Sequence, residues 1–182
     1  SRVLAPTPAR QFPATPPDAA QLAAREAARE AKTIEDLATR LAAFDGCALK
    51  ATAKNLCFYR GAVPARVMVI GEAPGADEDK LGKPFVGPAG QLFDKILAAV
   101  ALDDKQVHIT NIVYWRPPGN RTPTPQEAQV CRPFLERQME LVKPEIVILL
   151  GGAAAKHILD VPEGIMRLRG KWHDVTIGSH TA

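Results

Sequence analysis

The chain has 182 residues, of which 46% are hydrophobic, so it has the size of one domain and can bury a core. No apolar run approaches the roughly 18–20 residues that span a bilayer, and three widely spaced cysteines exclude a disulfide framework and a CxxC redox or zinc site. A net charge of +3 permits contact with a polyanion without demanding it. We expect one soluble globular unit in a reducing cytosol.

The N-terminal part of the chain divides into a tail and a helical region. Residues 1–17 contain five prolines and few large apolar groups, which predicts a flexible Pro-rich tail ahead of a domain over 18–182. Residues 18–44 are rich in Ala, Leu, Glu and Arg. Within them, Thr-Ile-Glu-Asp from Thr33 resembles a helix start, so either two helices or one kinked helix is expected.

Strand and helix patterns alternate from residue 66 onward. Short apolar or β-branched runs predict strands over 66–71, 106–113 and 145–152. Helices are expected over 88–100, 124–144 and 153–159, the second of them kinked at Pro133. Such alternation favours an α/β fold in which helices cover both faces of a parallel sheet. Ligands of these sheets bind where loops converge at the carboxyl ends of the strands.

Two loops occupy those positions. The first, residues 71–91, holds several glycines, four acidic residues and one aromatic, Phe85. Glycine lets a backbone approach a ligand closely, and loops of this length are uncommon unless they are functional or disordered. A solvated surface loop with Phe85 packed in the core explains the same residues equally well.

The second loop, residues 110–125, begins at the end of a predicted strand with Asn111. A side-chain amide presents both a donor and an acceptor, which suits the edge of a nucleobase, although an Asn in this place more often caps a turn. Arg116 and Arg121 flank a Pro-Pro-Gly turn, where they either contact phosphates or face solvent.

A series of motifs resembles the family 4 uracil-DNA glycosylases, in order along the chain: GEAPG (71–75), ED (78–79), GKPFVGPAGQL (82–92), ITN (109–111), RPPGNRTPTPQE (116–127), LLG (149–151) and RGKW (169–172). The resemblance implies a three-layer α/β/α sandwich around a four-stranded parallel sheet. It also implies a monofunctional DNA repair enzyme that flips uracil out of single- or double-stranded DNA and hydrolyses its bond to the sugar, leaving an abasic site. We expect a monomer with no membrane partner.

The resemblance assigns roles by position. Phe85 matches the aromatic that stacks on the flipped uracil, and Asn111 matches the amide that reads its Watson–Crick edge. Asn120, expected to support the acidic loop, and Ala73 join them as substrate contacts. The expected DNA contacts are Gly87, Pro88, Gly90, Arg116, Arg121 and Lys171.

The catalytic assignment centres on two glutamates. Ala73 stands where the family 1 enzymes carry a catalytic aspartate, so no side chain at this position orients water. The implied mechanism is dissociative, with an oxocarbenium-like sugar and a uracil anion held by hydrogen-bond donors. Glu72 or Glu78 then places water or balances the positive sugar, and we favour Glu72.

The cysteines depart from the family pattern. Members usually hold an iron–sulfur cluster on four cysteines, but only Cys47 and Cys131 match its ligands, while Phe44 and Trp115 stand at the other two positions. Because [4Fe–4S] clusters are normally held by four thiolates, we predict no cluster and no other metal, with the two aromatic side chains filling the space. Cys57 lies outside the pattern and is expected to be a small buried hydrophobe.

The C-terminal part departs as well. The family ends with a further strand and a His-Pro segment whose His reaches uracil O2, and neither appears before Ala182. Neither His173 nor His180 precedes a proline, so neither receives that role, and His108 and His157 are interpreted as structural.

Two alternative functions stay open. One is a non-catalytic or covalently trapping uracil-DNA binder, but relatives of that kind carry a basic, His-containing insertion that YWRPPGN lacks. The other is a nucleotide- or phosphate-binding regulatory module, although the first loop lacks both GKS/T and GxGxxG.

Overall fold

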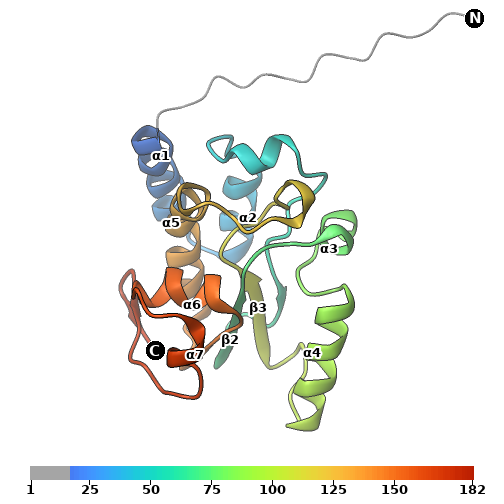
Figure 1. Cartoon of the computed structure of the whole chain (residues 1–182). Helices are drawn as coiled ribbons and strands as arrows, with labels where there is room; N and C mark the ends of the chain where they lie inside the picture. Colours follow the sequence, from blue (N-terminus) through green and yellow to red (C-terminus); the bar gives the residue numbers. More distant parts are fainter. Residues whose placement is uncertain (1–16) are drawn as a thin grey trace, which may run out of the picture.

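The computed structural model describes residues 17–182 (Figure 1). The helices are α1 (Pro17–Glu30), α2 (Ile34–Ala43), α3 (Ala76–Leu81), α4 (Pro88–Ala99), α5 (Pro125–Val142), α6 (Gly152–Leu159) and α7 (Ile165–Leu168), with the 3-10 turns η1 (Ala48–Ala51) and η2 (Pro118–Asn120). The strands are β1 (Arg60–Gly61), β2 (Val67–Gly71), β3 (Val107–Asn111), β4 (Ile146–Leu149), β5 (Thr176–Ile177) and β6 (His180–Thr181). None of these helices combines the length and apolar character that crossing a bilayer requires.

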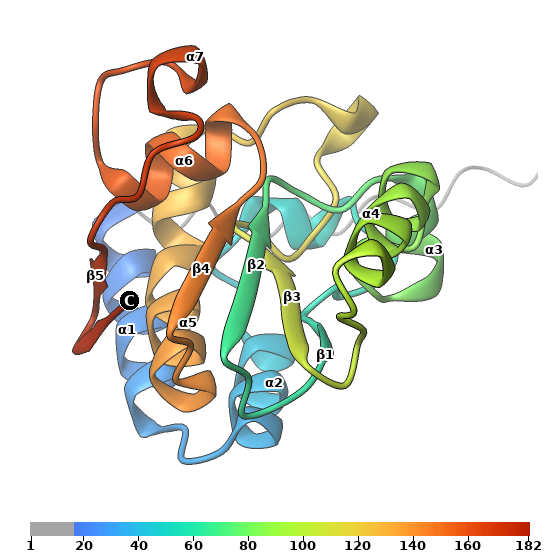
Figure 2. The same ribbon diagram turned by 90° about the horizontal axis from the view of Figure 1, so that it is seen from below.

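The main sheet has four strands in the order β1-β3-β2-β4. β2 pairs in parallel with both β3 and β4, and its register sets Gly71 opposite Asn111. β1 pairs antiparallel to β3, so the expectation of a wholly parallel sheet is wrong for this two-residue edge strand. The arrowheads of β2 and β4 in Figure 2 point to one edge of the sheet, where the connecting loops gather.

Helices cover both faces of the sheet, which confirms the predicted α/β/α arrangement. One core lies between the sheet and α1, α2, α5 and α6, and it includes Met68 and Ile70 of β2. A smaller core lies under α4 and includes Val69 of the same strand. Successive side chains of a strand point to opposite faces, so β2 contributes to both cores. Figure 2 shows α1, α2 and α5 on one side of the strands and α3 and α4 on the other.

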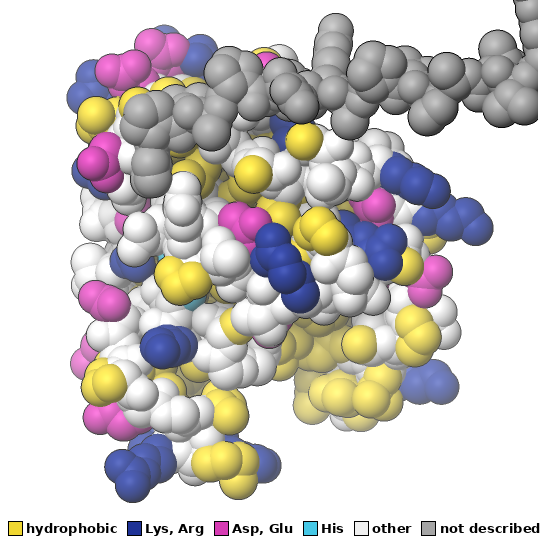
Figure 3. All heavy atoms as spheres, turned by 45° about the horizontal axis from the view of Figure 1, so that its top comes forward, with side chains coloured by type: hydrophobic (Ala, Val, Ile, Leu, Met, Phe, Trp, Pro, Cys, Tyr) yellow, Lys and Arg dark blue, Asp and Glu magenta, His cyan; other side chains and the backbone are white. Residues whose placement is uncertain are grey.

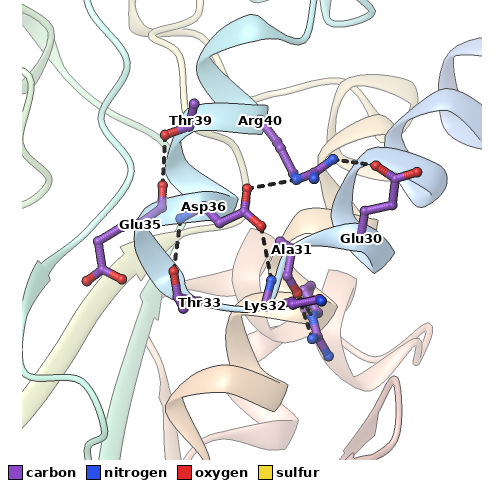
Figure 4. A network of polar contacts seen from close by, with 9 residues as sticks. Glu30, Ala31, Lys32, Thr33, Glu35, Asp36, Thr39 and Arg40 are labelled. Atoms are coloured by element: carbon purple, nitrogen blue, oxygen red, sulfur yellow. Dashed lines mark hydrogen bonds and ion pairs between the residues drawn. The ribbon is translucent and has the colours of Figure 1, made fainter.

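The first two helices form a separate pair, as one of the two sequence-based alternatives expected. The side chain of Thr33 accepts a hydrogen bond from the Asp36 amide and caps α2. Arg40 then bridges Asp36 of its own helix and Glu30 of α1 (Figure 4). The Pro-rich tail predicted over 1–17 lies, apart from Pro17, outside the described residues.

The predicted strands and the long helices are present, and none of their ends is shifted by more than three residues. α5 runs through Pro133 as one helix. The patterns gave no sign of α3, which interrupts the first loop, or of the hairpin formed by β5 and β6 near the C-terminal end.

Candidate active site

The carboxyl ends of β2 and β3 bring Gly71, Phe85 and Asn111 together. A Cβ atom built on Gly71 would lie 2.5 Å from Cζ of Phe85 and 2.6 Å from Oδ1 of Asn111. The aromatic ring and the carboxamide therefore border the same glycine, although they come from separate segments. The structure unites the two residues that the sequence assigned to base stacking and base reading, and those roles remain predictions.

Asn111 offers an uncommitted amide. The residue is only 2% exposed, as the last residue of an interior strand. Within residues 17–182 its carboxamide has no hydrogen-bond partner. Among the side chains described, Nε2 of His157 is the only polar atom that is both fully enclosed and without a partner. The unpaired carboxamide atoms of Asn111 are therefore not fully enclosed and remain accessible to solvent. Buried polar groups are normally hydrogen-bonded, so a free amide at this depth is suited to a ligand.

Glu78 holds the backbone on either side of the first loop. One carboxylate oxygen accepts hydrogen bonds from the Val86 and Gly87 amides, at 2.9 and 2.8 Å. The other accepts from the Gly75 amide at the start of α3, at 3.1 Å. Both oxygens of Glu78 are therefore engaged with backbone amides, and its catalytic role stays a prediction.

Phe85 itself is fixed from several directions. Its φ of 56° lies in the left-handed region, which is uncommon for a residue with a side chain. The carbonyl oxygen of Phe85 lies where a Cβ at Gly90 would stand, 1.9 Å away, so only glycine allows α4 to approach this closely. Arg60 donates to the carbonyl of Pro84 at 3.2 Å. The ring is half-buried and stacks obliquely on Phe93, with 5.9 Å between centroids.

The other acidic residues of the first loop separate into two kinds. Asp79 is buried, and its carboxylate accepts from the Lys54 and Asn55 amides at 2.8 and 3.0 Å. Glu72 and Asp77 accept no hydrogen bond from any described residue. Glu72 is half-buried and follows β2 directly, beside Ala73, so this residue lies at the carboxyl edge of the sheet.

The second loop is held by side-chain pairs. Arg116 donates to the Asn120 side chain at 2.6 Å, and the expected support of the acidic loop by Asn120 stays a prediction. Arg121 forms a two-pronged ion pair with Glu127 at 2.7 and 2.9 Å. This pair lowers the pKa of Glu127, which also caps α5 through the Thr124 amide. The Arg121 charge is therefore already neutralised within the protein.

The predicted DNA-binding residues lie in two places. Gly87, Pro88 and Gly90 form the start of α4, next to Phe85. Lys171 lines a separate cavity of about 800 Å³ between β4 and the C-terminal segment, together with the strongly exposed Trp172. None of the predicted uracil contacts lines that cavity. On the face shown in Figure 3, basic side chains are interspersed with acidic ones.

The cysteines do not supply a cluster site. Sγ of Cys47 and Sγ of Cys131 lie 4.0 Å apart, and both residues are buried. Cys57 lies elsewhere and donates to the Glu78 carbonyl at 3.1 Å. Between residues 17 and 182 no three His, Cys, Asp or Glu side chains are grouped to hold a metal. Two thiols do not fit a [4Fe–4S] cluster, which takes four.

Aromatic side chains stand at the other two ligand positions. Trp115 is buried, and the half-buried Phe44 packs against Phe134 with ring centroids 5.2 Å apart. The hydrogen bond from Cys131 lowers the pKa of Cys47, while that contact and burial raise the pKa of Cys131. The absence of a cluster stays a prediction that rests on this donor set.

A buried polar chain supports β3 beneath the site. Nδ1 of His108 lies 2.9 Å from the Ala62 carbonyl, and its Nε2 lies 2.8 Å from the side-chain nitrogen of Gln138. The side-chain oxygen of Gln138 accepts a hydrogen bond from the Tyr114 hydroxyl. Burial lowers the pKa of His108 to about 4, so the ring is neutral at neutral pH. Its role is structural, as expected.

Sequence reasoning missed three residues that shape the site. Gly71 leaves the space that the ring and the amide share, Arg60 anchors Pro84, and Asp79 fixes the segment before β1. Gly71 carried a signal, as the glycine that ends an apolar strand before a long loop, and Asp79 stood in the ED block at 78–79, but neither was assigned a role. The partners of the other two lie more than 20 residues away in the chain, where no local pattern reveals them.

Comparison with known proteins identifies the family. A model described as the uracil DNA glycosylase superfamily matches residues 58–182. The type-4 uracil-DNA glycosylase of Archaeoglobus fulgidus is 37% identical over 148 residues, covering 79% of this chain and 74% of that protein. Those of Thermotoga maritima and Pyrobaculum aerophilum are 36% and 43% identical, covering 75% and 64% of this chain and 72% and 60% of their own lengths. This chain therefore belongs to the uracil-DNA glycosylase superfamily and, within it, to the type-4 uracil-DNA glycosylases.

Proposed function

We propose that this chain removes uracil from DNA by hydrolysing the bond between base and sugar, leaving an abasic site in an uncut strand. One observation carries the proposal: the Phe85 ring and the Asn111 amide, which has no hydrogen-bond partner among residues 17–182, border the same glycine at the carboxyl edge of the sheet. That edge is where α/β folds bind ligands. Family membership and the names of the relatives support the same activity.

The two side chains divide the work of recognition. Stacking on an aromatic ring is worth about 1–3 kcal/mol per base but accepts every base alike. Selectivity therefore falls to Asn111, whose amide donates to O4 and accepts from N3–H of uracil. Cytosine presents an amino group and a bare nitrogen at these positions, so its binding leaves buried polar groups unpaired.

Glu72 is the carboxylate that we assign to the water or to the positive sugar. Its oxygens have no partner among the described residues, whereas both oxygens of Glu78 hold backbone amides. Ala73 beside it offers no acid, so bond breaking runs ahead of attack, and the uracil anion is stabilised by donors at the site. Glu78 contributes by holding Phe85 in place.

DNA is proposed to cross the start of α4 and the second loop, as a single strand or a duplex, on a monomeric enzyme. Gly87, Pro88 and Gly90 allow close approach of phosphates, although the Gly87 amide is already bound to Glu78. Arg116, Arg121 and Lys171 add positive charge, and Asn120 acts by orienting Arg116. We propose that the enzyme does this without an iron–sulfur cluster.

An oligonucleotide assay tests the function. The chain is incubated with an end-labelled oligonucleotide containing one uracil, and the product is treated with alkali, which breaks the strand at an abasic site. Alkali-dependent breakage is expected with uracil and not with cytosine. A heat-stable protein–DNA adduct would indicate trapping instead, and an intact, unbound oligonucleotide would contradict both.

Asn111→Ala separates recognition from DNA binding. The variant is expected to lose at least ten-fold in activity on uracil while its salt-dependent DNA affinity changes little, because the amide contacts the base and not phosphates. The matched comparison is Asn120→Ala, which is expected to lower DNA affinity through Arg116 without changing base selectivity. Equal loss of affinity in both variants, with selectivity unchanged, would refute the assignment of Asn111.

A further inference from the structure

Cys47 and Cys131 form a close thiol pair outside the proposed uracil site. They are 84 residues apart in the chain, yet their sulfur atoms lie 4.0 Å apart and each is the other's side-chain hydrogen-bond partner. Both residues are at most 3% exposed. The long sequence separation means that two independently folded elements, the turn after α2 and the helix α5, present these thiols to each other.

The turn that carries Cys47 is firmly held. Nζ of Lys50 donates to the carbonyls of Ala42 and Phe44 at 2.6 and 3.0 Å and to the Asp45 carboxylate at 2.6 Å. The Cys47 carbonyl accepts from the Lys50 amide at 3.1 Å. Cys131 is equally fixed, because it lies in the second turn of the capped helix α5. The two sulfurs are therefore brought together by the fold and not by chance side-chain motion.

The residues around this thiol pair favour a disulfide over a metal site. A third thiol, histidine or carboxylate that would complete a metal site is absent from the region that the structure describes. A disulfide, in contrast, needs only two sulfurs, which approach to about 2.05 Å in the bond. From the observed separation of 4.0 Å, the two sulfurs must approach by about 2 Å to form that bond.

We propose that Cys47 and Cys131 are a redox-active dithiol that closes into an intramolecular disulfide when the protein meets hydrogen peroxide. The Cys47 sulfur attacks the peroxide, the O–O bond breaks, and a sulfenic acid and one water result. The Cys131 sulfur then attacks the Cys47 sulfur, the S–O bond breaks, and a second water leaves. Two thiols lose two electrons and two protons, and one peroxide becomes two waters.

Cys47 is the thiol that peroxide reaches first, because residues next to it are exposed at the surface. Asp45 and Ala48 are exposed on either side of it, whereas Cys131 lies between the buried Val130 and the half-buried Arg132 of α5. Disulfides in a reducing compartment are usually transient and redox-sensing, and reduction by a dithiol returns the pair to its open form. The closed form joins the turn after α2 to the helix that follows the second loop. This inference does not depend on uracil excision.

Thiol counting on the whole chain tests the proposal. Reduced protein is treated with peroxide, unfolded without reductant, and its free thiols are counted. The count is expected to fall from three to one, and the remaining thiol is Cys57. Peptide mapping is expected to show a Cys47–Cys131 link, and the Tm is expected to rise by several degrees and return with dithiothreitol, since a long loop is closed.

Two variants supply the controls. Cys57→Ser is expected to form the same link, and Cys47→Ser, which alters a turn and not a helix interior, is expected to form none. Three surviving thiols, a link through Cys57, a link between two chains, or sulfinic acid on Cys47 without a link would each overturn the proposal. Purified protein carrying about four irons per chain would also overturn it, because the thiols would then be cluster ligands.

Discussion

The two loops at the carboxyl edge of the sheet are held in different ways. The loop after β2 is fixed by hydrogen bonds to its backbone: three amides donate to the Glu78 carboxylate, and Arg60 donates to the Pro84 carbonyl. The loop after β3 is held by side-chain pairs, Arg116 with Asn120 and Arg121 with Glu127.

This difference matches what each loop is proposed to do. Backbone contacts fix the position of the chain, and the loop that uses them carries the ring that must meet a base within a fraction of an ångström. Ion pairs at the surface contribute little to stability and exchange partners readily. We propose that Arg121 leaves Glu127 for a phosphate and that the second loop adapts to DNA in this way.

Gly71→Ala is the sharpest way to disturb the fixed loop. The new methyl group would stand 2.5 Å from the Phe85 ring and 2.6 Å from the Asn111 oxygen, so one of them must move. A displacement of about 1 Å costs on the order of 100-fold in rate, and uracil excision is expected to fall by that amount in single-turnover kinetics.

Gly152→Ala is the matched control, because its Cβ would meet its nearest neighbour, Ile165, at an ordinary 3.7 Å. Full activity in Gly71→Ala, with its folding intact by circular dichroism, would show that the ring and the amide do not act together.

Glu78→Gln weakens the same loop more gently. The amide side chain keeps one acceptor oxygen and replaces the other with a donor that faces a backbone N–H. Losing hydrogen bonds to a charged group costs roughly 2–3 kcal/mol, which corresponds to a Tm lower by about 5–10 °C. Activity on uracil is expected to fall about ten-fold as Phe85 loses its support.

Asp77→Asn is the comparison for this change, since Asp77 is an exposed neighbour that accepts no hydrogen bond from residues 17–182. If the two variants melted at the same temperature in differential scanning calorimetry, Glu78 would not be holding the loop.

Glu127→Gln acts on the adaptable loop and is expected to have the smallest effect. Glutamine preserves the cap of α5 but releases the Arg121 charge, which becomes available for a phosphate. The slope of log affinity against log salt is expected to steepen by up to about one unit, measured by fluorescence anisotropy at several salt concentrations.

Glu145→Gln releases Arg66 in the same way at the opposite edge of the sheet, where β2 and β4 begin. An equal change of slope in that variant would mean that the charge of Arg121 has no special place on the DNA path.

Regular elements were predictable because their signals are local and repeated. The apolar run of β4 predicts a strand, and the capping pattern from Thr124 predicts a helix start, in both cases from neighbouring residues alone. α3 was not predicted because its six residues include four charged ones and show no apolar stripe. β1 was not predicted because its two residues form a strand only by pairing with β3.

The site was predictable in part for a similar reason. Phe85 and Asn111 were found through blocks of matching residues, and their convergence follows from the parallel register of β2 and β3. The hydrogen bonds that Glu78 accepts could not be predicted, because their donors are backbone amides, which every residue other than proline carries. The pairing of Asn120 with Arg116 was not foreseen either, because only the folded turn brings the two side chains together.

The close approach at Gly90 leaves no side chain between α4 and the backbone of Phe85. The Phe85 carbonyl is seated where a methyl group at residue 90 would otherwise stand. A shift in the first turn of α4 therefore has to be passed to the backbone that carries the Phe85 side chain. We infer that the orientation of this helix helps to set the position of the ring.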